Sequence, residues 1–321
     1  MLLAQPLSAV LGHIVLHQVE GGLDTFSLWQ SYLRRNTAPD VLVIGDSRVR
    51  ADIDAGAIGK SLSRQRGQNI TAEKFGISGG QPSVLDGLLY RVLKRPSRPK
   101  VLVYALSEYS FNASYISDPT SDFWQMSDPP DVGFMRRAIR LDPKPLRLVE
   151  GWVMPVFEHA PVLSQPIECR VRPLEQATPC ANPSTLPRLT MTPASRDYVL
   201  SFYANIYLRN YVFSRQQAQY VRDAAQLAAS AAVKTCFVIL PVLGIDAIDP
   251  SSYTLFLSRM RSMANSLGAP LVDFHRELTG RPDLWTDPSH LNARGAAVFA
   301  DSFAKKTCPA LEQYGSTPVQ G

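Results

Sequence analysis

The sequence has few cysteines, and none is spaced as a metal or thiol-exchange site requires. Four occur in 321 residues, Cys169, Cys180, Cys236 and Cys308, and no two of them are separated by two residues. The Cys-x-x-Cys patterns of zinc and thiol chemistry are therefore missing, and we predict neither a metal nor a cofactor. Cys169 and Cys180 lie close together in a proline-rich stretch. They are either a loop-closing disulfide of an oxidising compartment or two free thiols.

The sequence also lacks a long uninterrupted apolar run. Residues 1–19 are mostly apolar but contain Gln5, His13, His17 and Gln18. A membrane-spanning helix needs about 20 predominantly apolar residues, and a secretory signal begins with basic residues, so the segment fits neither pattern. We treat residues 1–36 as a separate N-terminal segment, which is either the remnant of a membrane anchor or a helix that packs on the domain.

The excess of positive charge is small, since 33 Lys and Arg residues face 28 Asp and Glu residues and give +5 at pH 7. The densest basic patch stands where a helix is expected to end before a strand, a place where cations complement the helix dipole. No recognition helix or zinc knuckle accompanies it, so we predict no nucleic-acid partner. Weak attraction to an acidic polysaccharide or an anionic membrane face stays open. The patch contains Arg91, Lys94, Arg95, Arg98 and Lys100.

Hydrophobic residues make up 45% of the chain, which is enough for one large core or two smaller ones. Five short runs rich in β-branched residues lack polar alternation, as is typical of strands buried on both faces of a parallel sheet. These runs are residues 40–45, 70–77, 100–106, 235–241 and 270–274. Helical patterns lie at 55–65, 83–94, 195–233, 251–267 and 292–306. The alternation predicts an α/β fold, a three-layer α/β/α sandwich with a mostly parallel five-stranded sheet and ligands beyond its carboxyl edge.

Residues 110–195 interrupt this rhythm, with 13 of the 25 prolines and no sustained period. We predict a long proline-rich insertion after the third strand, within a domain of residues 37–312 that leaves 313–321 as a C-terminal tail. Such loops are usually lids or binding surfaces, and the alternative is an excursion without function. The aromatic residues from Tyr198 to Phe213 recur at helical spacing, so we expect them to form part of the core.

A serine stands at the carboxyl end of the first predicted strand, in Gly45-Asp46-Ser47-Arg48. This position is exposed at the sheet edge and rigidly held, and the N–H groups around such a turn can point at an anion. These properties suit a nucleophile. The alternative is a serine that caps the following helix.

A possible partner lies near the other end of the chain, in Asp287-Pro288-Ser289-His290. A carboxylate three residues before a histidine can hold imidazole Nδ1–H and leave Nε2 free to take a serine proton. We therefore predict a triad in which Ser47 is the nucleophile, His290 the general base and acid, and Asp287 the residue that orients the imidazole. The alternatives are that Asp287 caps a helix beside a surface histidine, or that His275 is the base.

Acyl transfer also needs hydrogen-bond donors for the oxyanion. The backbone N–H of Ser47 is one candidate, and Gly79, in the Ile77-Ser78-Gly79-Gly80 turn after the second strand, is the other. The alternative for Gly79 is a turn glycine with positive φ.

These blocks together resemble the SGNH, or GDSL, hydrolase superfamily. Gly45-Asp46-Ser47 is similar to the nucleophile block, Gly76-Ile77-Ser78-Gly79 to the oxyanion-glycine block, and Asp287-x-x-His290 to the last block. The resemblance spans residues 40–306. It implies a flavodoxin-like sheet and a Ser-His-Asp triad.

The third block departs from the family pattern. Members usually show Gly-x-Asn-Asp, whose asparagine completes the oxyanion hole, whereas this chain reads Ala105-Leu106-Ser107-Glu108. We expect Ser107 to substitute as a donor or Asn112 to reach back, and either way a weaker oxyanion hole.

With this departure, the chain is similar to a divergent branch that includes proteins of alginate O-acetylation and of teichoic acid D-alanylation. That resemblance implies a serine esterase or O-acyltransferase acting on acyl esters of cell-envelope carbohydrate through an acyl-serine intermediate. It also implies an extracytoplasmic, membrane-associated location beside a membrane-bound O-acyltransferase partner. The alternative is a catalytically weak or inactive protein of the same fold that binds a glycan or that partner.

Overall fold

The structure, a computed structural model, describes residues 32, 35–77, 79–115 and 190–306. Of these, residues from 36 onward belong to one compact unit. The proposed Cys169–Cys180 pair, most of the 110–195 insertion, the tail and nearly all of the N-terminal segment lie outside the described residues. Among the described residues, no helix combines the length and apolar character needed to cross a bilayer.

Five parallel strands form the central sheet, in the order β2-β1-β3-β4-β5. The strand β1 pairs with its neighbours in register, so that Val41 faces Ala72 of β2 and Val101 of β3. This order is that of the flavodoxin-like doubly wound fold, and it confirms the predicted fold class. The strands are β1 (Val41–Gly45), β2 (Ala72–Gly76), β3 (Val101–Ala105), β4 (Lys234–Ile239) and β5 (Leu271–Asp273).

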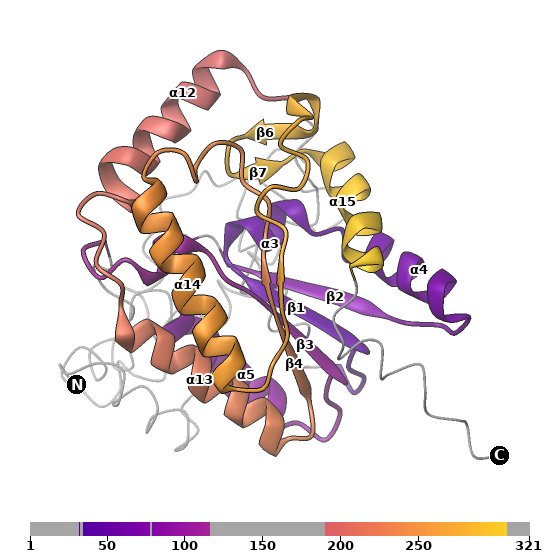
Figure 1. Cartoon of the computed structure of the whole chain (residues 1–321). Helices are drawn as coiled ribbons and strands as arrows, with labels where there is room; N and C mark the ends of the chain where they lie inside the picture. The colour runs from indigo at the N-terminus through magenta and orange to yellow at the C-terminus, as the bar shows by residue number, and fades with distance from the viewer. Residues whose placement is uncertain (1–31, 33–34, 78, 116–189, 307–321) are drawn as a thin grey trace, which may run out of the picture. The chain divides into compact units, whose positions relative to one another are not determined.

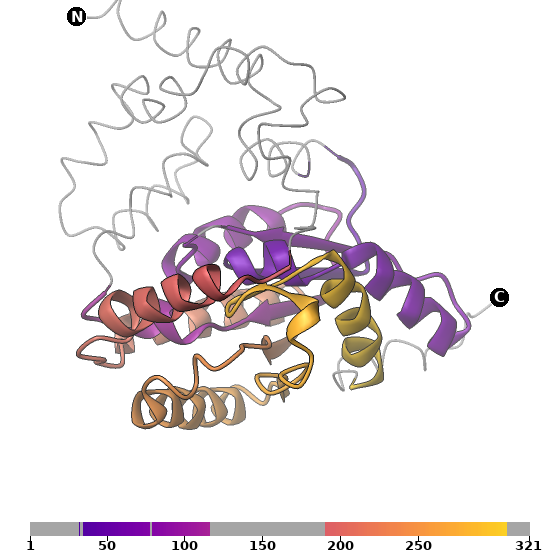
Figure 2. The ribbon, with the colours of Figure 1, turned by 90° about the horizontal axis from the view of Figure 1, so that it is seen from above.

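Helices cover both faces of the sheet (Figure 1 and Figure 2). Val41 and Val43 of β1 pack in a core cluster with residues of α4 and α15, while the alternate residues Leu42 and Ile44 are also buried and point to the opposite face. Burial on both faces explains the continuous apolar runs and gives the predicted three layers. The main helices are α4 (Ala55–Arg66), α5 (Pro82–Leu93), α13 (Arg215–Ser230), α14 (Pro250–Ser266) and α15 (Ala293–Lys305).

Capping residues in the sequence set several of these helix ends. Asp54 begins α4 by accepting a hydrogen bond from Ala57 N, and Gly67 ends it in the left-handed conformation, with φ of 67°. Asn292 begins α15 in the same way, accepting from Gly295 N at 2.9 Å. Since α15 directly follows the Asp287-x-x-His290 motif, this cap determines the residue at which the helix begins after the motif.

The predicted single helix over 195–233 is wrong. The chain forms α12 (Pro193–Phe202), a π-helical turn η3 (Tyr203–Tyr207) and an irregular stretch before Ser214 caps α13. The interruption turns the aromatic side chains in different directions, so Tyr203 is 3% exposed but Tyr198 is 70% exposed. The aromatic stripe is therefore not the continuous core face that its spacing suggests.

Short elements at the carboxyl edge of the sheet carry the candidate site. They are α3 (Ser47–Asp52), the 3-10 turns η1 (Glu108–Phe111) and η4 (Pro282–Leu284), and the two-stranded ribbon of β6 (Trp285–Asp287) and β7 (His290–Leu291). The ribbon contacts α3 through β7, and α15 packs on both α3 and α4. These contacts bring the end of the chain to the turn after β1.

Candidate active site

Ser47 is the first residue of α3 and directly follows the turn at the carboxyl end of β1. The helix cap is Asp46, whose Oδ1 accepts from Arg48 N at 2.9 Å. Because Asp46 takes the capping role, the alternative of Ser47 as a helix cap is wrong. The Ser47 hydroxyl is left to make other contacts.

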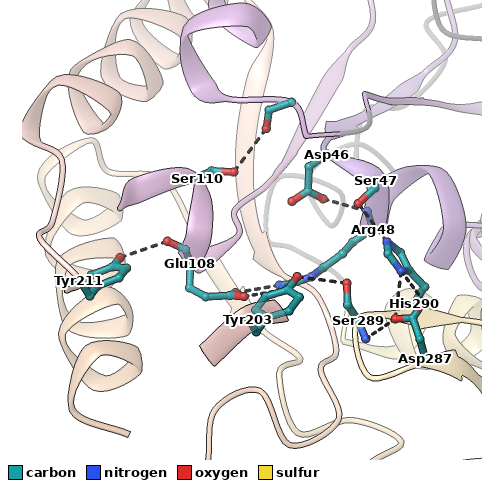
Figure 3. A network of polar contacts seen from close by, with 11 residues as sticks. Asp46, Ser47, Arg48, Glu108, Ser110, Tyr203, Tyr211, Asp287, Ser289 and His290 are labelled. Carbon is teal, nitrogen blue, oxygen red and sulfur yellow. Dashed lines mark hydrogen bonds and ion pairs between the residues drawn. The ribbon is translucent and has the colours of Figure 1, made fainter. Parts of the chain in front are cut away.

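His290 makes that contact (Figure 3). Its Nε2 lies 3.0 Å from Ser47 Oγ, and its Nδ1 lies 2.9 Å and 3.1 Å from the two carboxylate oxygens of Asp287. Asp287 and His290 face each other across the β6–β7 ribbon. With the carboxylate at Nδ1, a neutral imidazole carries its proton there and presents Nε2 as an acceptor to Ser47. The predicted meeting of the two motifs is confirmed, and the catalytic role of the three residues stays a prediction.

The surroundings of His290 favour its protonated form. Burial alone would lower the pKa of His290, but the hydrogen bond and charge of Asp287, together with the charge of Asp52, outweigh burial and raise it above 6.5. A raised pKa makes the imidazole a better proton acceptor once it is neutral. The His290 side chain remains about one quarter exposed, at 25%, so the ring borders space that a small substrate can reach.

A second carboxylate, Asp52, lies behind the motif at the end of α3. It is fully buried, its Oδ1 accepts from Leu291 N at 2.7 Å, and its Oδ2 has no hydrogen-bond partner among the described residues. Burial raises the pKa of Asp52 to about 7, against the opposing charge of His290. Asp54, two residues further on, caps α4, whereas Asp52 anchors the strand that carries His290.

The glycine-containing turn after β2 lies beside α3. A Cβ on Gly76 would come within 2.3 Å of Arg50 N, so only glycine allows this approach of β2 and α3. Gly79 has φ of 68°, and a Cβ there would meet no atom of the described residues within 4 Å. The turn-glycine alternative therefore describes its backbone correctly. The role of Gly79 as an oxyanion donor stays a prediction.

The two other candidate donors differ in their surroundings. Ser107 is 3% exposed and lines a small cavity that also contacts Asp46 and Gly80, so it lies close to the nucleophile turn.

Asn112 is not available as a donor, which corrects the expectation that it reaches back to the oxyanion. Its Nδ2 donates to Tyr207 O at 2.7 Å and Arg209 O at 3.4 Å, and its Oδ1 accepts from Ser114 N and Val212 N, both at 3.1 Å. Asn112 is fully buried and serves to hold the chain before α13. Its amide is thus committed to the backbone at both ends.

His275 is not the partner of Ser47. Its Nδ1 lies 2.6 Å from Asp273 Oδ1, at the end of β5, and Ser47 Oγ is contacted by His290 instead. The basic patch is also separate from the site, because it lies at the end of α5 and the amino end of β3. Within it, Lys100 pairs with Asp40 at 3.0 Å.

Beside Ser47, Asp287 and His290 lie four side chains that the sequence motifs do not predict as site residues: Arg48, Glu108, Tyr203 and Ser289 (Figure 3). Arg48 and Glu108 are both fully buried and form a bidentate ion pair with distances of 2.5 and 2.8 Å. The sequence does indicate that both residues lie near the site, since each closely follows a predicted buried strand and belongs to one of the blocks that resemble the family. Their pairing, across 60 residues of sequence, is not visible there.

No family model matches the chain, and no curated protein matches it. Among solved structures, it is similar to a Bacteroides fragilis protein described as a "putative acylhydrolase", with 11% identity over 89% of this chain and 96% of that chain and a TM-score of 0.39. A likeness this distant carries no argument about activity.

Proposed function

We propose that this protein is a serine-dependent acyl-transfer enzyme of the SGNH hydrolase type. The observation that carries the proposal is the line of contacts from Ser47 Oγ to His290 Nε2 at 3.0 Å and from His290 Nδ1 to Asp287 at 2.9 Å. These distances fall in the range that proton transfer between a nucleophile and its base requires. Ser47 and His290 are 243 residues apart in sequence, and both lie at the sheet edge where doubly wound folds bind ligands.

The geometry supports a two-step reaction. Ser47 Oγ attacks the carbonyl carbon of an ester while His290 Nε2 takes its proton, which gives a tetrahedral oxyanion. His290 then returns the proton to the departing alcohol oxygen, and the ester bond breaks to leave an acyl-Ser47. Water or a sugar hydroxyl attacks this intermediate, with His290 again taking and returning the proton, and Ser47 is released.

The hydrogen-bond donors that would stabilise the oxyanion are the weaker part of this site. The proposal assigns its stabilisation to the backbone N–H groups of Ser47 and Gly79, with the Ser107 hydroxyl as a third donor. Removing one such donor typically costs about 10²–10³ in rate. Since Ser107 stands where the family usually has asparagine, we expect slow turnover of simple esters.

We further propose that the substrate is an acyl ester of cell-envelope carbohydrate, and that the protein works outside the cytoplasm with a membrane-bound O-acyltransferase. This finer proposal rests on the resemblance of the nucleophile block, the altered third block and Asp287-x-x-His290 to envelope O-acetylation and D-alanylation proteins. The small excess of basic residues, +5 in all, suits an acidic polysaccharide.

The first experiment measures hydrolysis of p-nitrophenyl acetate and covalent labelling by a fluorophosphonate. We expect the wild-type chain to label and to turn over the ester, and Ser47→Ala to do neither while keeping its circular dichroism spectrum. Ser230→Ala is the matched control, because Ser230 lies at the end of α13, before the amino end of β4. Labelling that survives in Ser47→Ala, or a wild-type chain that never labels, would contradict the proposal.

A second candidate function is a binding protein with the same fold. The observation that favours it is the loss of any asparagine donor at the third block, since Ser107 and Glu108 occupy it and Asn112 is committed to the backbone. If the protein only binds, Ser47→Ala should bind the polysaccharide as well as the wild-type chain does. The wild-type chain should then not react with the fluorophosphonate. Affinity electrophoresis in acetylated and deacetylated alginate distinguishes the two, because only an enzyme would also change the acetyl content of the gel.

A further inference from the structure

A closed ring of contacts joins the nucleophile turn to the histidine turn (Figure 3). From Arg48, next to Ser47 in the chain, Nη2 donates to the Tyr203 hydroxyl at 2.9 Å. Tyr203 in turn donates to Ser289 Oγ at 3.1 Å. The ring therefore reaches the residue that immediately precedes His290.

The second half of the ring returns to the nucleophile. Ser289 N donates to Asp287 Oδ1 at 2.7 Å, and this same oxygen lies 3.1 Å from His290 Nδ1. His290 Nε2 then contacts Ser47 Oγ at 3.0 Å. The contacts thus form a closed path that includes the contact between Ser47 and His290.

Glu108 makes a charged arginine possible at this place. Arg48 is 0% exposed, and its charge is matched by Glu108, also 0% exposed, through two hydrogen bonds. The rings of Tyr109 and Tyr203 lie 5.8 Å from the guanidinium carbon, and the Tyr211 hydroxyl donates to Glu108 O at 3.2 Å. Arg48 is therefore held on several sides, and it presents one fixed donor to Tyr203.

We infer that Arg48, Glu108 and Tyr203 are positioning residues that hold Ser289, and through it His290, at the distance from Ser47 that proton transfer needs. This inference rests on the proposed function. Tyr203 is the central link of the ring, because it connects the ion pair, on the β1 and β3 loops, to the β6–β7 ribbon. The three segments come from distant parts of the chain, since Arg48 and Tyr203 are 155 positions apart and Tyr203 and Ser289 are 86 positions apart.

The ribbon has another support, which makes the inference testable without unfolding the chain. Leu243 N, after β4, donates to Pro288 O at 2.8 Å, and Leu291 N donates to Asp52. Loss of the Tyr203 hydroxyl therefore removes the hydrogen bond to Ser289 Oγ but leaves the ribbon attached at both sides. Replacing Glu108 would instead leave a buried, unpaired Arg48, a change that threatens folding itself, so Tyr203→Phe and Ser289→Ala are the better variants.

The experiment measures fluorophosphonate labelling of the full chain, and separates the maximal inactivation rate constant from the reagent concentration at half-maximal rate. We expect Tyr203→Phe and Ser289→Ala each to lower the rate constant about tenfold without changing the half-saturating concentration, because small displacements of reacting groups act on the chemical step. The double variant should be no slower than the slower single variant, since both changes break the same link. Tyr104→Phe is the control, because its buried hydroxyl has no hydrogen-bond partner among the described residues.

Three results would overturn the inference while leaving the proposed function intact. They are single variants that label at the wild-type rate, a double variant that loses about a hundredfold because the two effects multiply, and an effect confined to the half-saturating concentration. Ser289→Thr, which keeps a hydroxyl, should recover more of the rate than Ser289→Ala, and failure to do so would also count against it. A wild-type chain that does not label at all would contradict the proposed function instead.

Discussion

Replacing Asp52 by asparagine tests whether the acid behind His290 is as strongly perturbed as its burial implies. Asparagine keeps the shape of the side chain and can still accept the hydrogen bond that Leu291 N donates at 2.7 Å. It removes the titrating group. Its Nδ2 replaces an oxygen that has no hydrogen-bond partner among the described residues, which costs about 1–3 kcal/mol at every pH. The pH-dependent part of the change therefore reports the titration of Asp52 together with the change that its charge makes in the titration of His290.

The magnitude follows from the two pKa values of Asp52, 3.8 as the ordinary value and about 7 in the folded chain. Between these values the folded state holds a proton that the unfolded state has lost, so stability falls as pH rises. The contribution of Asp52 to the free energy of unfolding, relative to its value at low pH, is lower by about 2 kcal/mol at pH 5 and by about 4 kcal/mol at pH 8. Relative to wild type, the free energy of unfolding of Asp52→Asn should therefore be more favourable by about 2–3 kcal/mol at pH 8 than at pH 5.

Urea unfolding at pH 5 and pH 8 measures this difference. The titrations of groups that do not interact with Asp52 are shared by the two proteins and cancel in the comparison, whereas that of His290 changes as well, because the charge of Asp52 helps to raise its pKa. Asp54→Asn is the matched control, because it removes a carboxylate two residues away, where the side chain caps α4 rather than being buried. If the stability difference between Asp52→Asn and wild type is the same at both pH values, Asp52 is ionised throughout this range in the folded protein and the reasoning is refuted.

Three further predictions concern the rest of the site. Because Asp287 and Asp52 raise the pKa of His290 above 6.5, fluorophosphonate labelling should rise with pH with a midpoint above 6.5, and a midpoint below it would contradict this. Gly76→Ala should lower the free energy of unfolding by about 1–3 kcal/mol, because the new Cβ would stand 2.3 Å from Arg50 N. A thermal or urea melt measures this loss, and an unchanged melt would show that the backbone shifts to make room for the Cβ. Asn112→Ala should lower stability by about 2–4 kcal/mol, through its lost backbone hydrogen bonds, yet label within about twofold of the wild-type rate. A loss of labelling without a loss of stability would restore Asn112 as an oxyanion donor.

The sheet could be predicted from sequence because its strands are buried on both faces. A continuous apolar run such as 100–106, with helical patterns on either side, is typical of a strand in a parallel sheet. The strand observed there, Val101–Ala105, lies within one residue of each predicted end. Ser47 and His290 could be predicted for a related reason, since the carboxyl edge of a parallel sheet gathers the loops that follow its strands.

Other features depend on contacts that no local pattern carries. The aromatic residues between Tyr198 and Phe213 keep a helical spacing, but the chain leaves the α-helix at the π-helical turn of Tyr203–Tyr207, and only Tyr203 of the series is buried. The residue type of Asn112 suits a donor, whereas its amide is used by the backbone around Tyr207. The residue types and their spacing thus predict Ser47, Asp287 and His290 as site residues. Which other polar side chains contact them depends on the tertiary structure.

The same limit applies to the ion pair beside the site. Arg48 and Glu108 each follow a strand, and no local pattern links them across the 60 residues that separate them. Which loops meet at the sheet edge is set by the strand order, in which β1 lies directly beside β3. Once the strand order is known, the charged residues that follow the neighbouring strands β1 and β3 can be predicted to pair.

The central claim is that His290 removes the proton of Ser47, and the most direct measurement locates the fluorophosphonate adduct by peptide mass spectrometry in wild type and in His290→Ala. We predict one adduct in the wild-type chain, on Ser47, and a rate at least about a thousandfold lower in His290→Ala. An adduct on a different nucleophile, or one that forms on Ser47 equally fast without the imidazole, would contradict the account.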